Sequence, residues 1–361
     1  MTVKITPSTH AVSEADRAEK VAKPGFGKYY TDHMVVAEWT EEDGWGQAEL
    51  KPYAPISLDP AAMVFHYGQE IFEGLKAYRQ PDGSISLFRP EANALRFQRS
   101  AARLALPELP TQTFLESLDA LVTQDAGWVP SNIGESLYLR PFMFATEVGL
   151  GVRPTNRAMY MLIATPAAAY FNSDNAVTVW ISMEYVRAVP GGTGEAKCGG
   201  NYAASLIAQK EAAKEGCDQV VWIDAKERKW VEEMGGMNLY FVRGSGKDAT
   251  IITPKLTGAL LAGITRDSIL TLAKDLGYKS EEVMISIDEW RDGVASGEIT
   301  EIFACGTAAV VTPVGSAKSA KGTWVTGDGT PGPITKQIRN GLLGIQHGTI
   351  EDKHHWMRKV L

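Results

Sequence analysis

The alternation of short strand-like runs with helical segments is the feature that most limits the fold of this chain. Between residues 29 and 89 the sequence reads as short β-rich runs, one of them Met63–Tyr67. Two further runs flank the turn signal Gln80–Gly83 and predict a hairpin. Helical periodicity over Glu91–Leu104, with Pro90 in the first turn, predicts that a helix follows. The first half is therefore expected to be α+β.

A change of composition divides the chain in two. Residues 166–177 are small and polar, and we interpret them as a linker between a smaller N-terminal α/β domain (1–165) and a larger strand-rich domain (178–361). A chain of 361 residues is long enough for two domains. The expected fold class is thus a two-domain α+β protein. The polar residues before position 25 are expected to form a loose arm.

Charge and cysteine content exclude several classes of protein. A net charge of −7 and a pI near 5.5 argue against binding to nucleic acid or to an anionic membrane. We find no apolar run of membrane-spanning length and no signal-peptide core within residues 1–28. Three widely spaced cysteines suit free thiols in a reducing cytoplasm. The six histidines show no metal-ligand spacing, so no metal site is expected.

The run Lys197–Tyr202, with sequence KCGGNY, carries the strongest chemical signal. A lysine beside glycines in an apolar setting can act as a nucleophile, because burial lowers its pKa and makes the neutral amine accessible. Such an amine can condense with an aldehyde. Taken alone, Lys197 is more simply a surface lysine in a glycine loop, since short motifs match by chance.

A carboxylate in a similar setting follows downstream. Glu233 opens the apolar, glycine-containing run 233–238, where an ionised carboxylate is costly unless it has a cationic partner. A protonated ring nitrogen would be one such partner. Glu232 lies next to it, and the two could instead form a solvated acidic pair, so spacing alone does not choose between them.

Two turns offer backbone N–H groups to an anion. Leu261–Asp267 reads as a loop that enters a helix, and a helix N-terminus can bind phosphate. Ordinary capping by Thr265 explains the same residues equally well. Cys305–Ala308 is a second small, polar turn, and Arg96 would add charge, although alone it is more simply a solvated helix residue. Aldehyde, ring nitrogen and phosphate are the three groups by which pyridoxal phosphate (PLP) is held.

Over nearly its whole length the chain resembles the branched-chain amino acid aminotransferases of the class IV (fold type IV) PLP-dependent family. That family resemblance implies the fold type IV architecture, with the cofactor between the two domains. The order and number of the matching runs carry the resemblance: Phe72–Lys76, Leu87–Pro90, Leu137–Pro141, Lys197–Tyr202, Glu233–Asn238, Gly263–Asp267 and Gly306–Ala308.

The resemblance implies a role for each member of a set of residues. Lys197 would be the lysine to which PLP is attached, Glu233 the partner of the pyridine nitrogen, and Tyr202 a contact of the phenolic oxygen. The residues implied for the phosphate are Arg96, Ile264, Thr265 and Thr307. Those implied for the substrate pocket are Tyr30, Phe72, Tyr138, Arg140, Tyr170, Thr307 and Ala308, with Tyr67 in support.

The implied reaction is the reversible, ping-pong transfer of the amino group of L-leucine, L-isoleucine or L-valine to 2-oxoglutarate. The implied assembly is a homodimer in which the loop Leu150–Val152 reaches the neighbour's pocket. D-amino acid aminotransferases and aminodeoxychorismate lyases would share Lys197 and the phosphate site but differ in the pocket residues of the first half. A PLP carrier or regulatory protein is the non-enzymatic alternative, against which the combination of base, pyridinium partner and substrate arginine argues.

Three departures from the family pattern stand out. Ala262 replaces a proline found in many members, which loosens the turn. Gly236 replaces a threonine found in some, so one contact to the substrate carboxylate is expected to be missing. The run Ala308–Val311 lacks the Cys-x-x-Cys pair of mammalian members, which indicates a bacterial-type enzyme without that thiol switch.

Overall fold

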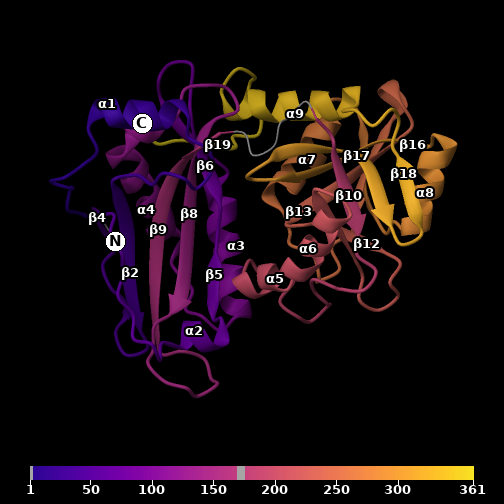
Figure 1. The fold of residues 1–361 in the computed structure, drawn as a ribbon. Helices are drawn as coiled ribbons and strands as arrows, with labels where there is room; N and C mark the ends of the chain where they lie inside the picture. The colour runs from indigo at the N-terminus through magenta and orange to yellow at the C-terminus, as the bar shows by residue number, and fades with distance from the viewer. Residues whose placement is uncertain (1–2, 169–174) are drawn as a thin grey trace. The chain divides into compact units, whose positions relative to one another are not determined.

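A computed structural model describes residues 3–168 and 175–361, in two compact units (Figure 1). Unit 1 comprises residues 1–170, 196–199 and 344–361, and unit 2 comprises residues 171–195 and 200–343. The chain therefore returns to unit 1 twice, once in a short segment around Lys197 and once after residue 343.

Both returns lie in segments that the sequence assigns to the second domain, and each has a backbone cause. The Phe72 N–H donates to the Lys197 carbonyl oxygen at 2.9 Å, which attaches the first segment to unit 1. The strand β19 (Met357–Lys359) pairs antiparallel with β7 (Ile85–Phe88), which attaches the second. Hydrogen bonds between residues that are distant in sequence therefore determine to which unit these segments belong.

Unit 1 is built on a ten-stranded sheet with the main order β1-β4-β2-β9-β8-β6-β7-β19, in which β3 pairs with β2 and β5 with β8. The predicted hairpin is formed by β6 and β7. The remaining strands also pair mostly antiparallel, apart from β1 with β4. The strand bounds are β1 Lys4–Ile5, β2 His33–Thr40, β3 Gly44–Trp45, β4 Glu49–Pro52, β5 Glu70–Phe72, β6 Leu75–Arg79, β8 Ser136–Ala145 and β9 Arg157–Ala167.

Two helices, α3 (Pro90–Arg103) and α4 (Thr111–Gln124), pack on each other and on this sheet. Pro90 is the first residue of α3, as predicted from its fixed φ and missing N–H. The apolar faces of the helices meet the strands at the rings of Phe97, Phe114 and Tyr160, whose centroids lie 5.5 to 6.4 Å apart. The helix that the sequence predicts over 91–104 is thereby confirmed as α3.

The prediction of a strand at Met63–Tyr67 is wrong, because these residues form the short helix α2. The Asp59 carboxylate accepts from the Ala61 N–H, and a turn at Asp59 starts the helix. Gly68 ends it in the left-handed conformation, with φ at 58°. The turn that precedes the helix and the glycine that ends it therefore outweigh the β-propensity of the run.

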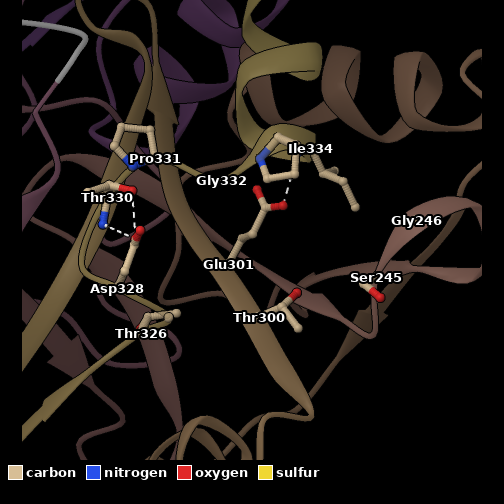
Figure 2. A pocket seen from close by; sticks show the side chains of 12 residues that line it. Ser245, Gly246, Thr300, Glu301, Thr326, Asp328, Thr330, Pro331, Gly332 and Ile334 are labelled. Carbon is tan, nitrogen blue, oxygen red and sulfur yellow. Dashed lines mark hydrogen bonds between the residues drawn. The ribbon is translucent and has the colours of Figure 1, made fainter.

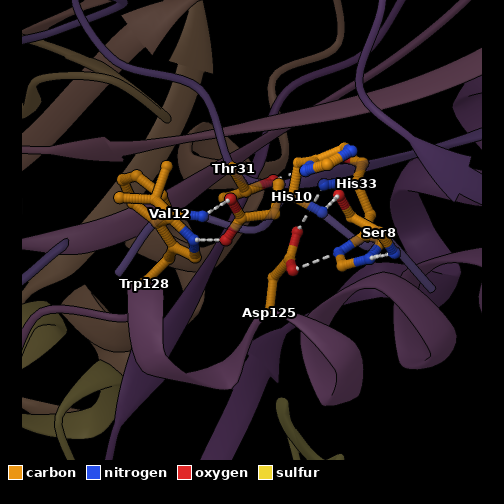
Figure 3. A network of polar contacts seen from close by, with 8 residues as sticks. Ser8, His10, Val12, Thr31, His33, Asp125 and Trp128 are labelled. Carbon is orange, nitrogen blue, oxygen red and sulfur yellow. Dashed lines mark hydrogen bonds and ion pairs between the residues drawn. The ribbon is translucent and has the colours of Figure 1, made fainter. Parts of the chain in front are cut away.

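The residues before position 25 are not a loose arm. They contain β1 and the helix α1 (Glu14–Ala22). A polar network ties them to the rest of unit 1 (Figure 3). The Val12 N–H and the Trp128 indole N–H both donate to the Asp32 carboxylate at 2.7 Å. The short helix η1 (Ala126–Trp128) thus shares one acceptor with the arm.

His33 forms the second half of this network (Figure 3). Its Nε2 accepts from the Ser8 N–H at 2.8 Å, and its Nδ1 lies 2.6 Å from Asp125 Oδ1. Because a backbone N–H can only donate, Nε2 carries no proton and the ring donates from Nδ1. Burial raises the pKa of Asp125, while the His33 hydrogen bond acts in the opposite direction.

Unit 2 is built on a nine-stranded sheet with the main order β12-β11-β10-β17-β16-β13-β14-β15, in which β18 pairs with β17 and β12 also pairs with β13. Its core includes Phe241 of β13 against Trp290 of α8, with ring centroids 5.3 Å apart. The strand bounds are β10 Val177–Ile181, β11 Gln219–Ile223, β12 Val231–Met234, β13 Met237–Arg243, β14 Thr250–Pro254, β15 Lys279–Val283, β16 Ile299–Gly306, β17 Val310–Ser319 and β18 Gly322–Val325.

The sequence predicts a helix over residues 203–215, and the structure has the helix α6 at Leu206–Lys214, with Ala203 as the last residue of the preceding helix α5. No helix within residues 3–168 and 175–361 combines the length and the apolar character needed to cross a membrane. The helical bounds in this part of the chain are α5 Gly199–Ala203, α6 Leu206–Lys214, η2 Gly246–Asp248, α7 Ile264–Asp275, α8 Ile287–Ser296 and α9 Pro333–Gln346.

Candidate active site

Lys197 lies in unit 1 with its backbone fixed on both sides. Its N–H donates to Ser100 Oγ of α3 at 3.0 Å, and its carbonyl oxygen accepts from Phe72. The Gly199 N–H donates to the Glu70 carboxylate, with which a Cβ at this position would collide. The side chain of Lys197 is half-buried, with Nζ 4.8 Å from the centroid of the Phe72 ring. The amine is thus held beside an apolar surface.

Three of the residues predicted for the substrate pocket form one cluster in unit 1. The Arg140 guanidinium lies 4.8 Å from the ring centroid of Phe72 and 5.3 Å from that of Tyr138, and donates to the Tyr138 hydroxyl at 3.1 Å. Its Nε is buried and has no hydrogen-bond partner among the described residues. A Cβ on Gly74 would collide with the Tyr138 hydroxyl, so glycine is needed there. A cation with an unmet donor is suited to a carboxylate ligand.

Arg96, predicted for the phosphate, is buried on α3 rather than solvated. It pairs with Glu73, with Nε 2.7 Å from Oε1 and Nη2 2.9 Å from Oε2. The sequence alone favours the interpretation of Arg96 as a solvated helix residue. That interpretation is wrong, because the side chain is buried. Its burial follows from the two-point contact with a carboxylate, which offsets the cost of removing both charges from water.

Glu233 lies on β12 of unit 2 and is 2% exposed. Its Oε2 pairs with Arg187 Nη2 at 3.1 Å, and its Oε1 accepts from the Leu261 N–H at 2.7 Å. The amide of Asn238 on β13 adds a longer contact of 3.4 Å. Because Glu232 is buried as well, the two glutamates are not a solvated acidic pair. Arg187 supplies the cationic partner that a buried carboxylate requires.

The turn at residues 261–267 leads into α7, whose N-cap is Gly263. Thr265 therefore lies inside the helix, and the alternative that it caps the helix is wrong. A glycine cap has no side chain for the first N–H groups, which leaves them to an anion or to solvent. A Cβ on Gly263 would collide with Asn238 Oδ1, so the start of α7 contacts β13 directly.

The second turn follows β16 in the same unit. Cys305 pairs with Asn238 across β13 and β16, and Gly306 pairs with Val310 at the end of β16. Thr307 and Ala308, both half-buried, lie in the turn between these paired residues. Asn238 thus contacts the elements that carry all three of Glu233, Gly263 and the Thr307 turn.

Tyr202 lies on α5 and packs on Gly236. A Cβ at Gly236 would come 3.3 Å from Tyr202 Cε1 and 3.6 Å from its hydroxyl oxygen. A threonine at this position would press on the ring. The glycine is therefore matched to the position of Tyr202, and the departure from the family pattern has a local physical reason.

The structure gives the other predicted pocket residues different neighbours. Tyr30 stacks on Tyr53, with ring centroids 5.2 Å apart and an interplanar angle of 7°. The Tyr67 hydroxyl donates to the Leu150 carbonyl oxygen. Tyr170 lies outside the described residues.

Several polar residues at these sites were missed by sequence reasoning. Glu73 belongs to a run that carries the family resemblance, so its position could have drawn attention. Glu70 and Arg187 stand in no motif, and only their contacts reveal them. Lys76 is also buried, and burial lowers its pKa to about 8. Because of this lowered pKa, Lys76 is an alternative candidate to Lys197 for the nucleophilic amine.

A separate pocket of about 350 Å³ lies in unit 2 at the start of α9 (Figure 2). The Glu301 carboxylate on its wall accepts from the Ile334 N–H, the Thr335 N–H and the Thr335 hydroxyl at 2.7 to 3.0 Å. None of the described residues predicted for the active site lines this pocket. We therefore assign Glu301 to capping α9.

Comparison with known proteins identifies the family. The sequence profile described as "Amino-transferase class IV" matches residues 70–317. A probable branched-chain-amino-acid aminotransferase of Streptomyces coelicolor is 59% identical over 361 residues, covering 99% of each chain. The branched-chain-amino-acid aminotransferase of Mycolicibacterium smegmatis is 60% identical over 358 residues, covering 99% of this chain and 97% of the relative. The chain belongs to the class IV amino-transferase family.

A solved structure extends the comparison to the fold. The branched-chain amino acid aminotransferase of Escherichia coli superposes with a TM-score of 0.74 at 27% identity. The superposition covers 90% of this chain and 99% of that one. The fold type IV, two-domain α+β architecture expected from the sequence is confirmed.

The stability of unit 2 should depend on pH through Glu232. Burial, opposed by Arg187 and reinforced by Glu233 and Asp224, raises the pKa of Glu232 from 4.5 to about 7. The Glu232 carboxyl group loses its proton near pH 4.5 in the unfolded chain but only near pH 7 in the folded chain. The folded state therefore loses stability as the pH rises from about 4.5 to about 7. In Glu232→Gln this loss is absent. The free energy of unfolding of the variant minus that of the parent should therefore increase through the interval and then level off.

Urea denaturation at a series of pH values measures this difference. The control is Glu227→Gln, which changes an exposed glutamate nearby and should give a difference that does not vary with pH. A flat difference for Glu232→Gln as well would contradict the raised pKa.

Proposed function

We propose that this protein is a PLP-dependent aminotransferase that moves the amino group of L-leucine, L-isoleucine or L-valine reversibly to 2-oxoglutarate. The observation that carries the proposal is the full-length identity of 59% and 60% to relatives that bear the name branched-chain-amino-acid aminotransferase. The structure supports it through the chemistry of the residues that each unit offers.

The residues of each unit fit the groups of PLP. In unit 2, the buried Glu233 carboxylate is oriented by Arg187 and the Leu261 N–H, and an oriented carboxylate can accept a further ring N–H. The glycine-capped start of α7 suits the phosphate, and Tyr202 beside Gly236 suits the phenolic oxygen. In unit 1, Lys197 offers the amine and Arg96 a buried cation.

When bound, PLP supplies the electron sink that makes removal of a Cα proton possible. In this proposal Lys197 Nζ acts as a base that takes the proton from the substrate Cα and then as an acid that donates it to C4′ of the cofactor. The Glu233 carboxylate holds the proton on the ring nitrogen. Arg187 and the Leu261 N–H orient that carboxylate, because each contacts one of its two oxygens.

Two kinds of substrate must share one pocket. The Phe72 ring provides an apolar wall for a branched side chain, and the Arg140 guanidinium beside it provides a partner for the second carboxylate of 2-oxoglutarate. Tyr138 fixes the guanidinium through its hydroxyl. This pairing of an aromatic surface with a partly unsatisfied cation suits both amino donor and acceptor.

We further propose that the protein is a homodimer in the cytoplasm. Exposed apolar side chains gather around α2 and the loop after β8, and the Tyr67–Leu150 hydrogen bond and the Ala62–Val148 bridge join these two segments. Apolar patches of this kind mark interfaces, and a second copy of the chain would cover this one. The patch comprises Phe65, Tyr67, Val148, Leu150 and Val152.

The proposed cytoplasmic location rests on the cysteines. Three buried cysteines suit a reducing compartment.

Borohydride reduction in the presence of PLP should fix the cofactor on a peptide that contains Lys197. Lys197→Ala should abolish this labelling and lower turnover of L-leucine by about 10²- to 10⁴-fold, because the proton at Cα loses its acceptor. Peptide mass spectrometry identifies the labelled residue. The exposed Lys210→Ala is the control and should label normally. Labelling on Lys76 in the parent protein would overturn the assignment.

Arg140→Ala should raise KM for 2-oxoglutarate by about 10- to 100-fold, because a charge-assisted pair is lost. The KM for L-leucine should change much less, since its side chain has no carboxylate. Arg140→Lys, which keeps the charge but not the planar fork, should fall between the parent and the alanine variant. Steady-state kinetics with each substrate varied in turn measures the two effects. Equal losses for both substrates would contradict the proposed role.

Val152 is 84% exposed within the proposed interface, so Val152→Asp should place a charge where the partner chain binds. Light scattering should give twice the chain mass of 39.2 kDa for the parent and a shift toward the single-chain mass for the variant. The control is Ile133→Asp, at an apolar residue of unit 1 that is 72% exposed and lies outside the patch. A monomeric parent, or an unaffected variant, would argue against this interface.

A further inference from the structure

Glu73 is a buried carboxylate to which the function proposed above gives no role. It follows β5 directly, and its N–H donates to the Pro141 carbonyl oxygen of β8 at 2.7 Å. Its side chain is 0% exposed. An ionised carboxylate in such a place is costly unless several donors surround it.

Three neighbours supply those donors. Arg96 contacts both oxygens, from Nε at 2.7 Å and from Nη2 at 2.9 Å. The Asn93 amide donates to Oε2 at 2.7 Å, and the Gly74 N–H donates to the same oxygen at 3.1 Å. Asn93 and Arg96 are three residues apart and so lie on one face of α3. The two-point contact fixes the plane of the guanidinium as well as its distance.

Lys197 is the second cation near Glu73. Its backbone bonds to Phe72, the residue before Glu73, and to Ser100, one turn beyond Arg96 on α3. Burial acts to raise the pKa of Glu73, but Arg96, Lys197 and Asn93 outweigh it and hold that pKa below its usual value. One carboxylate therefore interacts with both the cation proposed for the phosphate and the amine proposed for proton transfer.

We propose that Glu73 is a positioning residue that orients the Arg96 guanidinium toward the phosphate of the cofactor. The inference rests on the role proposed above for Arg96. Glu73 itself acts only through this residue. Without its carboxylate, the Arg96 guanidinium loses the two-point contact that fixes its plane.

The first test compares PLP with pyridoxal, which lacks the phosphate, in binding to the apoenzyme by fluorescence titration. Glu73→Gln keeps the volume of the side chain but removes its charge. Its Kd for PLP should rise about tenfold or more, because the donors to a charged ligand are misplaced. Its Kd for pyridoxal should change by less than about twofold, since that ligand makes no contact of this kind. A parallel loss for both ligands would show a merely structural role.

A double-mutant cycle tests whether the effect passes through Arg96. In an Arg96→Gln background, Glu73→Gln should leave the ratio of the two Kd values unchanged. An undiminished effect in that background would overturn the proposal. Removing both members of the pair also leaves no buried charge unpaired, so this variant folds where the single change is too costly. Glu73→Asp, which keeps the charge, should recover part of the parent's preference for PLP.

The matched control is Asp119→Asn, which breaks the Arg358–Asp119 pair elsewhere in unit 1. It should leave the ratio of the Kd values for PLP and pyridoxal unchanged. If PLP labels Lys197 normally but this ratio does not change in Glu73→Gln, only this inference fails. If PLP does not label Lys197, the proposed function fails first.

Discussion

The attachment of residues 196–199 to unit 1 is the constraint on which the rest of the site depends. Two backbone hydrogen bonds at Lys197 and one at Gly199 join this segment to β5 and α3, although the residues on either side of it belong to unit 2. The amine therefore lies beside Phe72, whose ring the Arg140 guanidinium also contacts. Its chemistry is set by a unit distant from it along the chain.

A buried arginine–glutamate pair lies in each unit among the residues proposed for the cofactor. Glu73 with Arg96 and Glu233 with Arg187 are both removed from water, which costs several kcal/mol per ion before the pairing is counted. Such pairs contribute little net stability compared with apolar side chains of the same size. Their presence is consistent with the proposed binding of the cofactor, to which Arg96 and Glu233 are assigned as proposals.

Local patterns sufficed for part of the fold, since α3 and the β6–β7 hairpin follow from periodicity and turn signals. They failed at Met63–Tyr67, where the turn at Asp59 precedes a short helix that Gly68 ends. The resemblance supplied Lys197, Glu233 and Arg140, whose roles remain predictions. Arg187 and Glu70 could not be found from the sequence, because long-range contacts create their importance and no local pattern records such contacts.

The pairing of β19 with β7 affects the order in which the two units can complete folding during synthesis. Residues 344–361 leave the ribosome after the whole of unit 2, so the edge strand of unit 1 is made only after unit 2. Until then β7 presents an open edge to other nascent chains, and such edges favour aggregation. Unit 2 is continuous in sequence except that residues 196–199 belong to unit 1. Its sheet can therefore be completed earlier. Unit 1, most of which is synthesised first, therefore completes its fold after unit 2.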